Sequence, residues 1–368
     1  MNPRIEINTD KLMYNAQQIC RMTEPHGITP AAVTKGFCAI PQAASALVAG
    51  GVKILADSRI ENLKKLRTLG ARTMLLRLPM ISQAEKVVKY ANISLNSEWE
   101  TLQALNKAAE KQNVSHQIIL MVDLGDLREG IMKEEELLKM VKKLERLKQL
   151  SLIGLGTNLT CFGAVIPDEK NLNQLVEMAE KVEAILGRKL EFVSGGNSSS
   201  VYLLMENRMP EGITNLRIGE SMLLGTESAF GERVPGMYYD AFQLVAEVIE
   251  IKEKPSVPIG EIGMDAFGGK PTFEDKGIRK RAIVAVGKQD LATHPVKSLE
   301  PGVEVLGSSS DHMLLDITDA EKKYDIGSEM RFSLSYGAML ALTTSPYVCT
   351  QLVSGGLKHK RGEKNENH

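Results

Sequence analysis

Short runs of aliphatic and β-branched residues alternate with longer amphipathic segments between residues 31 and 220. Eight such runs occur, and a segment with helical spacing follows each of them. Several runs are apolar throughout, as residues 117–122 are, which is typical of strands buried on both faces of a parallel sheet. The eight expected strands cover residues 31–35, 53–57, 73–77, 93–97, 117–123, 152–157, 191–195 and 215–220.

The helical pattern is clearest in residues 134–150 and 171–186, where Leu, Val and Met recur every three or four positions between Lys and Glu. Eight alternations of strand and helix predict an α/β fold, a (β/α)8 TIM-type barrel. In such a barrel the functional groups lie at the carboxyl ends of the strands. The loops after strands seven and eight often hold a phosphate.

After about residue 233 the pattern changes to irregular short strands separated by Pro, Gly and Asp. This pattern predicts a smaller, mostly-β domain with strands at 242–251, 281–286, 303–306 and 313–317, and residues 4–7 are a candidate strand to pair with it. The expected domains are 1–233 for the barrel, 234–355 for a C-terminal β domain that completes the active site, and 356–368 for a disordered tail.

Composition narrows the classes of function. With 43% hydrophobic residues, 25% charged residues and a formal net charge of -1, the chain lacks the basic surface that nucleic acids require. No apolar stretch approaches the roughly 20 residues that span a bilayer, and the first residues are typical of a strand, so we expect a cytoplasmic protein. The four cysteines and six histidines lack paired or metal-ligand spacing, which predicts free thiols and no metal site.

Lys35 is the only charged residue in the apolar run from 28 to 37. A lysine that ends a buried strand loses solvation, which frees its amine to act as a nucleophile or to form a Schiff base. The alternative is a lysine that caps the strand and extends outward to water. The loops 194–200 and 217–221 follow strands seven and eight and supply small residues, hydroxyls and backbone N–H groups suited to a phosphate. Either loop alone is also typical of an ordinary turn with a serine N-cap.

Four segments, 32–35, 122–130, 194–198 and 216–219, together resemble the fold-type III family of pyridoxal-phosphate enzymes. The resemblance is to alanine racemases, in their alanine/ornithine racemase branch. It implies an amino-acid racemase that uses pyridoxal 5'-phosphate and exchanges the Cα proton between two bases. It also implies a homodimer with shared active sites and an amino-acid substrate. Composition and the lack of a long apolar stretch predict neither nucleic acid nor membrane as a partner.

By the same resemblance, Lys35 forms the imine link to pyridoxal phosphate and is the first catalytic base. The residues expected to hold the phosphate or to belong to the same motif are Ser194, Asn197, Ser198, Ile218 and Gly219. Arg217 matches the arginine that donates to the pyridine nitrogen; because a guanidinium cannot accept a proton, the nitrogen stays unprotonated and quick reprotonation of the substrate is favoured. A salt bridge at a strand end is the alternative for Arg217. Arg128 matches the arginine near the phenolic oxygen and the substrate carboxylate, which a guanidinium fork fits.

Several positions depart from alanine racemase. Asn158 stands where that enzyme has a histidine beside the cofactor ring, and Met121 stands where many members have a carbamylated lysine. The stretch 258–268 lacks the tyrosine that serves as the second base. Asp265 and Glu261 are candidates to replace it or to face a cationic substrate side chain, and a solvated turn is the alternative.

Three residues near the C-terminus are further candidates. Tyr347 matches a tyrosine at the mouth of the family's active site, which implies cofactor contact or catalysis, with half-buried packing as the alternative. Residues 310–312 resemble the Met-Asp-Gln segment that contacts substrate in alanine racemase, so Asp311 is a candidate substrate-binding residue. His312 beside it is expected to be structural.

The resemblance favours ornithine as the substrate, with lysine or another basic amino acid as the alternative. Acidic candidates in the second domain agree with this choice, because they could neutralise a distal amine. Two other functions are considered. One is a fold-type III decarboxylase. That group has a characteristic cysteine in its second domain, but Cys349 follows Tyr347 and does not lie in the region 308–311 where it would be expected. The other is a pyridoxal-phosphate homeostasis protein, whose relatives are single barrels without a second domain.

Overall fold

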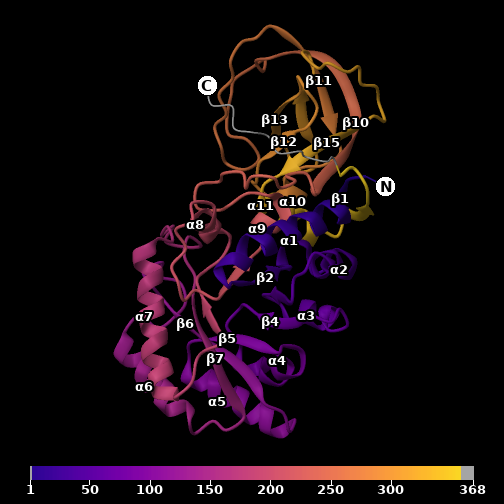
Figure 1. Cartoon of the computed structure of the whole chain (residues 1–368). Helices are drawn as coiled ribbons and strands as arrows, with labels where there is room; N and C mark the ends of the chain where they lie inside the picture. Colours follow the sequence, from indigo (N-terminus) through magenta and orange to yellow (C-terminus); the bar gives the residue numbers. More distant parts are fainter. Residues whose placement is uncertain (1, 358–368) are drawn as a thin grey trace. The chain divides into compact units, whose positions relative to one another are not determined.

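The computed structural model describes residues 2–357, which form two compact units (Figure 1). One unit comprises Thr9–Tyr239 with residues 354–357, and the other comprises residues 2–8 with Asp240–Val353. These boundaries differ from the expected division at 233/234, because the first strand joins the mostly-β unit and residues 234–239 stay with the barrel. Most of the predicted disordered tail, residues 358–368, lies outside the described residues.

The larger unit is a closed barrel of eight strands, which confirms the predicted fold class. All neighbours are parallel, and β9 pairs with β2, with Ala31 beside Arg217, to close the ring. The strands are β2 (Thr29–Val33), β3 (Ile54–Asp57), β4 (Arg72–Leu75), β5 (Ile93–Asn96), β6 (His116–Val122), β7 (Leu150–Thr157), β8 (Phe192–Ser194) and β9 (Asn215–Ile218). Their buried side chains form the core, which includes Ala31, Ile54, Met74, Ile93, Ile119, Met121 and Phe192.

A helix follows each barrel strand. The helices are α2 (Pro41–Ala49), α3 (Ile60–Leu66), α4 (Ala84–Tyr90), α5 (Trp99–Lys111), α6 (Glu134–Leu144), α7 (Glu169–Leu186), α8 (Val201–Met205) and α9 (Glu220–Leu224), with α1 (Thr9–Thr23) before the barrel. Short 3-10 turns are η1 (Glu24–His26), η2 (Lys35–Phe37), η3 (Ile81–Gln83) and η4 (Ser198–Ser200). Helix α6 is shorter than predicted, because a turn at 145–149 brings the chain into β7 at Leu150.

The smaller unit is built on an eight-stranded sheet. Its path runs β12-β15-β10-β11-β14-β13, and β1 pairs antiparallel with β10 and parallel with β16. The elements are β1 (Arg4–Asn8), β10 (Phe242–Pro255), β11 (Ile278–Val284), α10 (Lys288–Leu291), β12 (Val296–Ser298), β13 (Glu304–Ser308), β14 (Met313–Asp316), β15 (Glu329–Leu334), α11 (Tyr336–Thr344) and β16 (Cys349–Val353). The pairing of β1 with β10 confirms that residues 4–7 join this sheet.

Within residues 2–357, no helix combines the length and apolar character that a membrane crossing needs. The four cysteines are not joined by disulfides. The same part of the chain contains no group of three or more His, Cys, Asp or Glu side chains placed to hold a metal ion.

Candidate active site

Lys35 lies at the carboxyl end of the first barrel strand, as the sequence predicted, but two residues beyond its last residue, Val33. The chain turns there because Thr34 donates its N–H to the carbonyl of Ala56 on β3, at 2.8 Å, and η2 then begins at Lys35. The lysine side chain is half-buried in this turn. Its amine therefore belongs to the barrel face where catalytic groups are found in this fold.

Asp57 is a residue of this rim that the sequence analysis missed. It is fully buried at the end of β3 and accepts hydrogen bonds from the Thr34 hydroxyl at 2.6 Å, the Arg59 N–H at 2.9 Å and the Asn62 amide at 3.1 Å. Burial raises the pKa of Asp57, while these hydrogen bonds and the positive charge of Lys35 lower it in part. Asp57 thereby fixes the residue that precedes Lys35 in the turn.

Arg217 is almost fully buried in β9, and its guanidinium is held in one place. It donates to the Ser194 hydroxyl and to the Thr157 carbonyl, both at 2.5 Å. Ser194 donates to the side chain of Asn215, whose amide donates to the Thr29 carbonyl at 2.7 Å. Burial lowers the pKa of Arg217 to about 10, so the guanidinium still carries its charge at neutral pH.

The ends of β8 and β9 form a cradle of hydroxyl and backbone groups. Ser198 Oγ accepts the N–H groups of Gly219 and Ser221, both at 3.2 Å, so the two loops are joined at this hydroxyl. Gly219 sits where a Cβ atom would lie 3.2 Å from Val33 Cβ, and Gly196 has a φ of +112°, which a side chain would strain. Hydroxyl and glycine backbone groups are thus brought together at the two loops where the sequence predicted a phosphate.

Asp126 ties the loop after β6 to the loop after β7, and it too was not predicted. Its fully buried carboxylate accepts three backbone N–H groups of the second loop. They belong to Phe162, Gly163 and Val165, at 3.0, 3.1 and 3.3 Å. These hydrogen bonds join the two loops, although they are more than thirty residues apart in the chain.

Arg128 stands on the loop after β6 and is exposed. Its guanidinium forms a two-pronged ion pair with Glu129. Burial lowers the pKa of Arg128, but the hydrogen bonds and the negative charge of Glu129 outweigh this effect and raise the pKa above its ordinary value. The arginine is therefore always charged, and among the described residues its ion-pair partner is the adjacent Glu129.

Three buried polar atoms beside the ends of β7 and β8 have no hydrogen-bond partner among the described residues: Thr157 Oγ1, Asn158 Nδ2 and Ser199 Oγ. Asn197 lies beside them and donates to Asn158 Oδ1 at 3.2 Å and to the Leu159 carbonyl at 3.0 Å. A buried polar group without a partner costs free energy, so such atoms indicate a ligand that completes their hydrogen bonds. Together with Lys35, the cradle and Arg217, these residues fit the phosphate, aldehyde and ring of pyridoxal phosphate.

The predicted residues of the mostly-β unit fall into two groups. Asp311, His312 and Tyr347 line one hollow of about 390 Å³ together with Asp290, whose buried carboxylate accepts the Ser345 hydroxyl at 2.6 Å. Tyr347 donates its N–H to the same Ser345 hydroxyl at 3.2 Å.

Asp265 and Glu261 lie elsewhere in this unit, on the exposed segment between β10 and β11. Asp265 Oδ1 accepts the N–H groups of Gly269 and Phe267, both at 2.8 Å, and these bonds lower the pKa of Asp265. The carboxylate thus takes part in a solvated turn, the alternative that the sequence left open. It has no contact with the hollow that Asp311 and Tyr347 share.

The barrel, with a lysine, a fixed arginine and the Ser198 cradle at the carboxyl ends of its strands, is typical of (β/α)8-barrel enzymes that bind a phosphorylated ligand there. Sequence comparison agrees with this class. The sequence model of the family described as alanine racemase, N-terminal domain, matches residues 7–227, and the chain belongs to this family.

Two relatives cover nearly the whole chain. The ornithine racemase of Acetoanaerobium sticklandii is 49% identical over 96% of this chain and 100% of its own. The lysine racemase of Thermotoga maritima is 38% identical over 94% of this chain and 97% of its own.

Solved structures share the fold. Alanine racemase from Streptomyces lavendulae superposes with a TM-score of 0.73 at 18% identity, covering 98% of this chain and 100% of the other. Alanine racemase from Bartonella henselae with covalently bound pyridoxal phosphate gives 0.71 at 17% identity, covering 96% and 100%. At this identity the likeness establishes the architecture of both units and no more.

Proposed function

We propose that this chain is a pyridoxal-phosphate-dependent racemase that interconverts the L and D forms of a basic amino acid, with ornithine as the preferred substrate. The observation that carries the proposal is the 49% identity to an ornithine racemase over 96% of the chain. The second relative, a lysine racemase, supports a substrate with a distal amine. The departures from alanine racemase at Asn158 and Met121 agree with a substrate other than alanine.

The rim residues have two proposed roles, which are to bind the cofactor and to transfer the Cα proton. Pyridoxal phosphate, when bound, supplies an electron sink for the pair left at Cα. Lys35 holds it through its amine and exchanges the Cα proton on one face. Ser198, Ile218 and Gly219 hold the phosphate, with Ser194 and Asn197 supporting them. Arg217 donates to the ring nitrogen without giving up a proton.

Arg128 clamps the substrate carboxylate, because its guanidinium stays charged and its exposed position leaves it free to turn from Glu129 to a ligand. Asn158 contacts the cofactor through the amide nitrogen that has no partner among the described residues. In the mostly-β unit, Asp311 serves substrate binding. The second base is Tyr347 in preference to Asp265, because the turn that holds Asp265 lowers its pKa and so weakens it as a base.

The test is isotope exchange. The purified holoenzyme is incubated with L-ornithine, L-lysine or L-alanine in deuterated water, and both the loss of optical activity and deuterium at Cα are followed. We expect exchange and racemisation with ornithine and lysine and little with alanine. Absence of exchange with every amino acid would refute the racemase, and exchange confined to alanine would refute the choice of substrate.

The assignment of Lys35 has its own test. Borohydride reduction should leave the cofactor covalently attached to the peptide that contains Lys35, as mass spectrometry would show. We further propose a cytoplasmic homodimer whose active sites are shared between subunits. A fully active monomer in sedimentation at the assay concentration would contradict the shared site.

A further inference from the structure

The barrel has a pocket on the face opposite the Lys35 rim. We call it the basal pocket, because its residues come from the amino-terminal ends of β4, β6 and β7 and from the loops and helix ends beside them. It encloses about 680 Å³, a size within the range of about 300–1,000 Å³ that small-molecule sites occupy. Its lining comprises Arg67, Thr73, residues 88–92, Gln112, residues 114–117 and Ser151.

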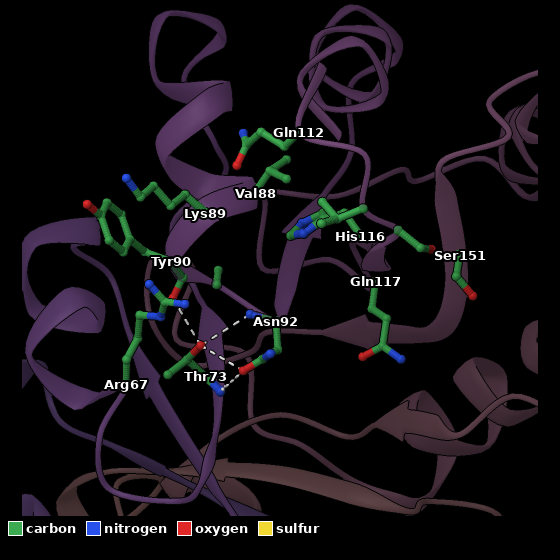
Figure 2. Close-up of a pocket in the computed structure, with 13 residues that line it drawn as sticks. Arg67, Thr73, Val88, Lys89, Tyr90, Asn92, Gln112, His116, Gln117 and Ser151 are labelled. Atoms are coloured by element: carbon green, nitrogen blue, oxygen red, sulfur yellow. Dashed lines mark hydrogen bonds between the residues drawn. The ribbon is translucent and has the colours of Figure 1, made fainter. Parts of the chain in front are cut away.

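The charges of the basal pocket have one sign. Arg67 and Lys89 line it, and their cationic groups lie 5.6 and 5.5 Å from the centre of the Tyr90 ring (Figure 2). Neither makes an ion pair with a described residue, and no Asp or Glu is among the residues that line the pocket. His116 is neutral, since burial lowers its pKa to about 4. An uncompensated positive potential in a concave site favours an anion.

Two amide side chains of the basal pocket have a donor that no residue within 2–357 accepts. Asn92 Oδ1 accepts the N–H and the hydroxyl of Thr73, at 2.8 and 3.0 Å. The Asn92 amide nitrogen is therefore not engaged by Thr73. Gln117 Oε1 accepts from Arg72 at 2.7 Å, so the Gln117 amide nitrogen is likewise not engaged by Arg72. Because N–H groups cannot accept hydrogen bonds, both orientations are fixed. Neither nitrogen makes a hydrogen bond to a described residue.

Figure 2 shows Arg67, Lys89 and Tyr90 along one side of the basal pocket and Gln117 and Ser151 on the other. Asn92 and His116 lie between these two groups, and the hydroxyl of Ser151 is a further donor without a partner among the described residues. A ligand that matches this arrangement carries a negative group for the cations and several acceptors for the amide nitrogens.

We propose that the basal pocket binds a small organic oxyanion, bearing a carboxylate or a phosphate, held by Arg67, Lys89 and the amide nitrogens of Asn92 and Gln117. The site is separate from the catalytic rim and does not depend on the proposed racemase activity. Guanidinium and amide donors recognise both oxyanion types, so the experiment distinguishes them.

The test measures binding of inorganic phosphate and of succinate to the holoenzyme by titration calorimetry in Tris chloride at low ionic strength. The bound cofactor keeps its own phosphate cradle filled. We expect saturable binding of at least one probe, and the probe that binds identifies a phosphate or a carboxylate ligand. Absence of saturable binding of both probes would overturn the proposal.

Three substitutions localise the binding. Asn92→Asp keeps the acceptor for Thr73 and replaces the unpartnered donor by a negative oxygen, and Arg67→Gln removes a cation. Each should weaken binding about tenfold or more, as expected for the loss of a charge-assisted contact. Lys86→Gln is the matched control, because it makes the same change in net charge on an exposed part of α4 outside the pocket lining. Equal weakening in all three variants, or none in Asn92→Asp and Arg67→Gln, would refute the proposed site.

Discussion

His116 makes the stability of the barrel depend on pH, and the structure gives the size of the effect. The side chain is 2% exposed at the start of β6, and its Nε2 forms a hydrogen bond of 2.8 Å with the Ser94 hydroxyl. Burial lowers the pKa of His116 from its ordinary value of 6.5 to about 4, since a charged imidazole would lose its hydration. As the pH falls, the unfolded chain therefore binds a proton at His116 at a higher pH than the folded chain does.

The difference between these two values sets the free energy involved. Each tenfold change in proton affinity corresponds to about 1.4 kcal/mol, so neutral His116 contributes at most about 3 kcal/mol to the free energy of unfolding. The folded state has the lower pKa, so the contribution is present in full above pH 6.5 and decreases as the pH falls towards 4. About 2 kcal/mol of it should be gone by pH 5.

The assay is urea unfolding at pH 7 and pH 5 for the wild type and for His116→Gln, which retains a polar side chain for Ser94. The difference between their changes in unfolding free energy isolates His116 from all other titrating groups. We expect the wild type to lose about 2 kcal/mol more than the variant over this interval. His312→Gln, at an exposed position, is the control for removal of a histidine. Equal pH dependence in wild type and His116→Gln would refute the reasoning.

Three further predictions concern the rim. Asp126→Asn should speed hydrogen exchange at residues 162, 163 and 165 and lower stability by about 2 kcal/mol, since an amide nitrogen would face a backbone N–H; unchanged exchange would contradict this. Ser198→Ala should weaken cofactor retention about tenfold in a dilution and ultrafiltration assay, and retention equal to wild type would exclude Ser198 from the cradle. Gly130→Ala should cost at least about 2 kcal/mol more in urea unfolding than Gly70→Ala, because both have positive φ but only at Gly130 would a Cβ lie 2.5 Å from a backbone atom.

The barrel could be predicted because its strands are buried on both faces, which leaves uninterrupted apolar runs in the sequence. The sheet of the smaller unit is harder to predict. Strand β16 has mostly exposed side chains, and its parallel pairing with β1 joins residues separated by almost the whole chain. No local pattern indicates such a pairing, and β12 and β15 were missed as well.

Candidate site residues were found where the sequence breaks its own pattern. Lys35 interrupts an apolar run, and Arg217 and the Gly/Ser loops end predicted strands. Asp57 shows the same signal, an acidic residue that closes an apolar strand, and the criterion applied to Lys35 could have found it. Asp126 could not have been found in this way, because its role depends on a loop that only the folded chain brings to it.

The two arginines of the rim have opposite environments, and this contrast determines how freely the surroundings of each can change. Arg217 is buried and bonded to Ser194 and Thr157, so a substitution nearby would disturb the barrel core. Arg128 is exposed, and Glu129 is its one ion-pair partner within residues 2–357. Met121 packs in the apolar core, and Glu129 carries the negative charge beside Arg128. Changes around Arg128 therefore alter the proposed carboxylate clamp at little cost to folding, whereas changes around Arg217 do not have this freedom.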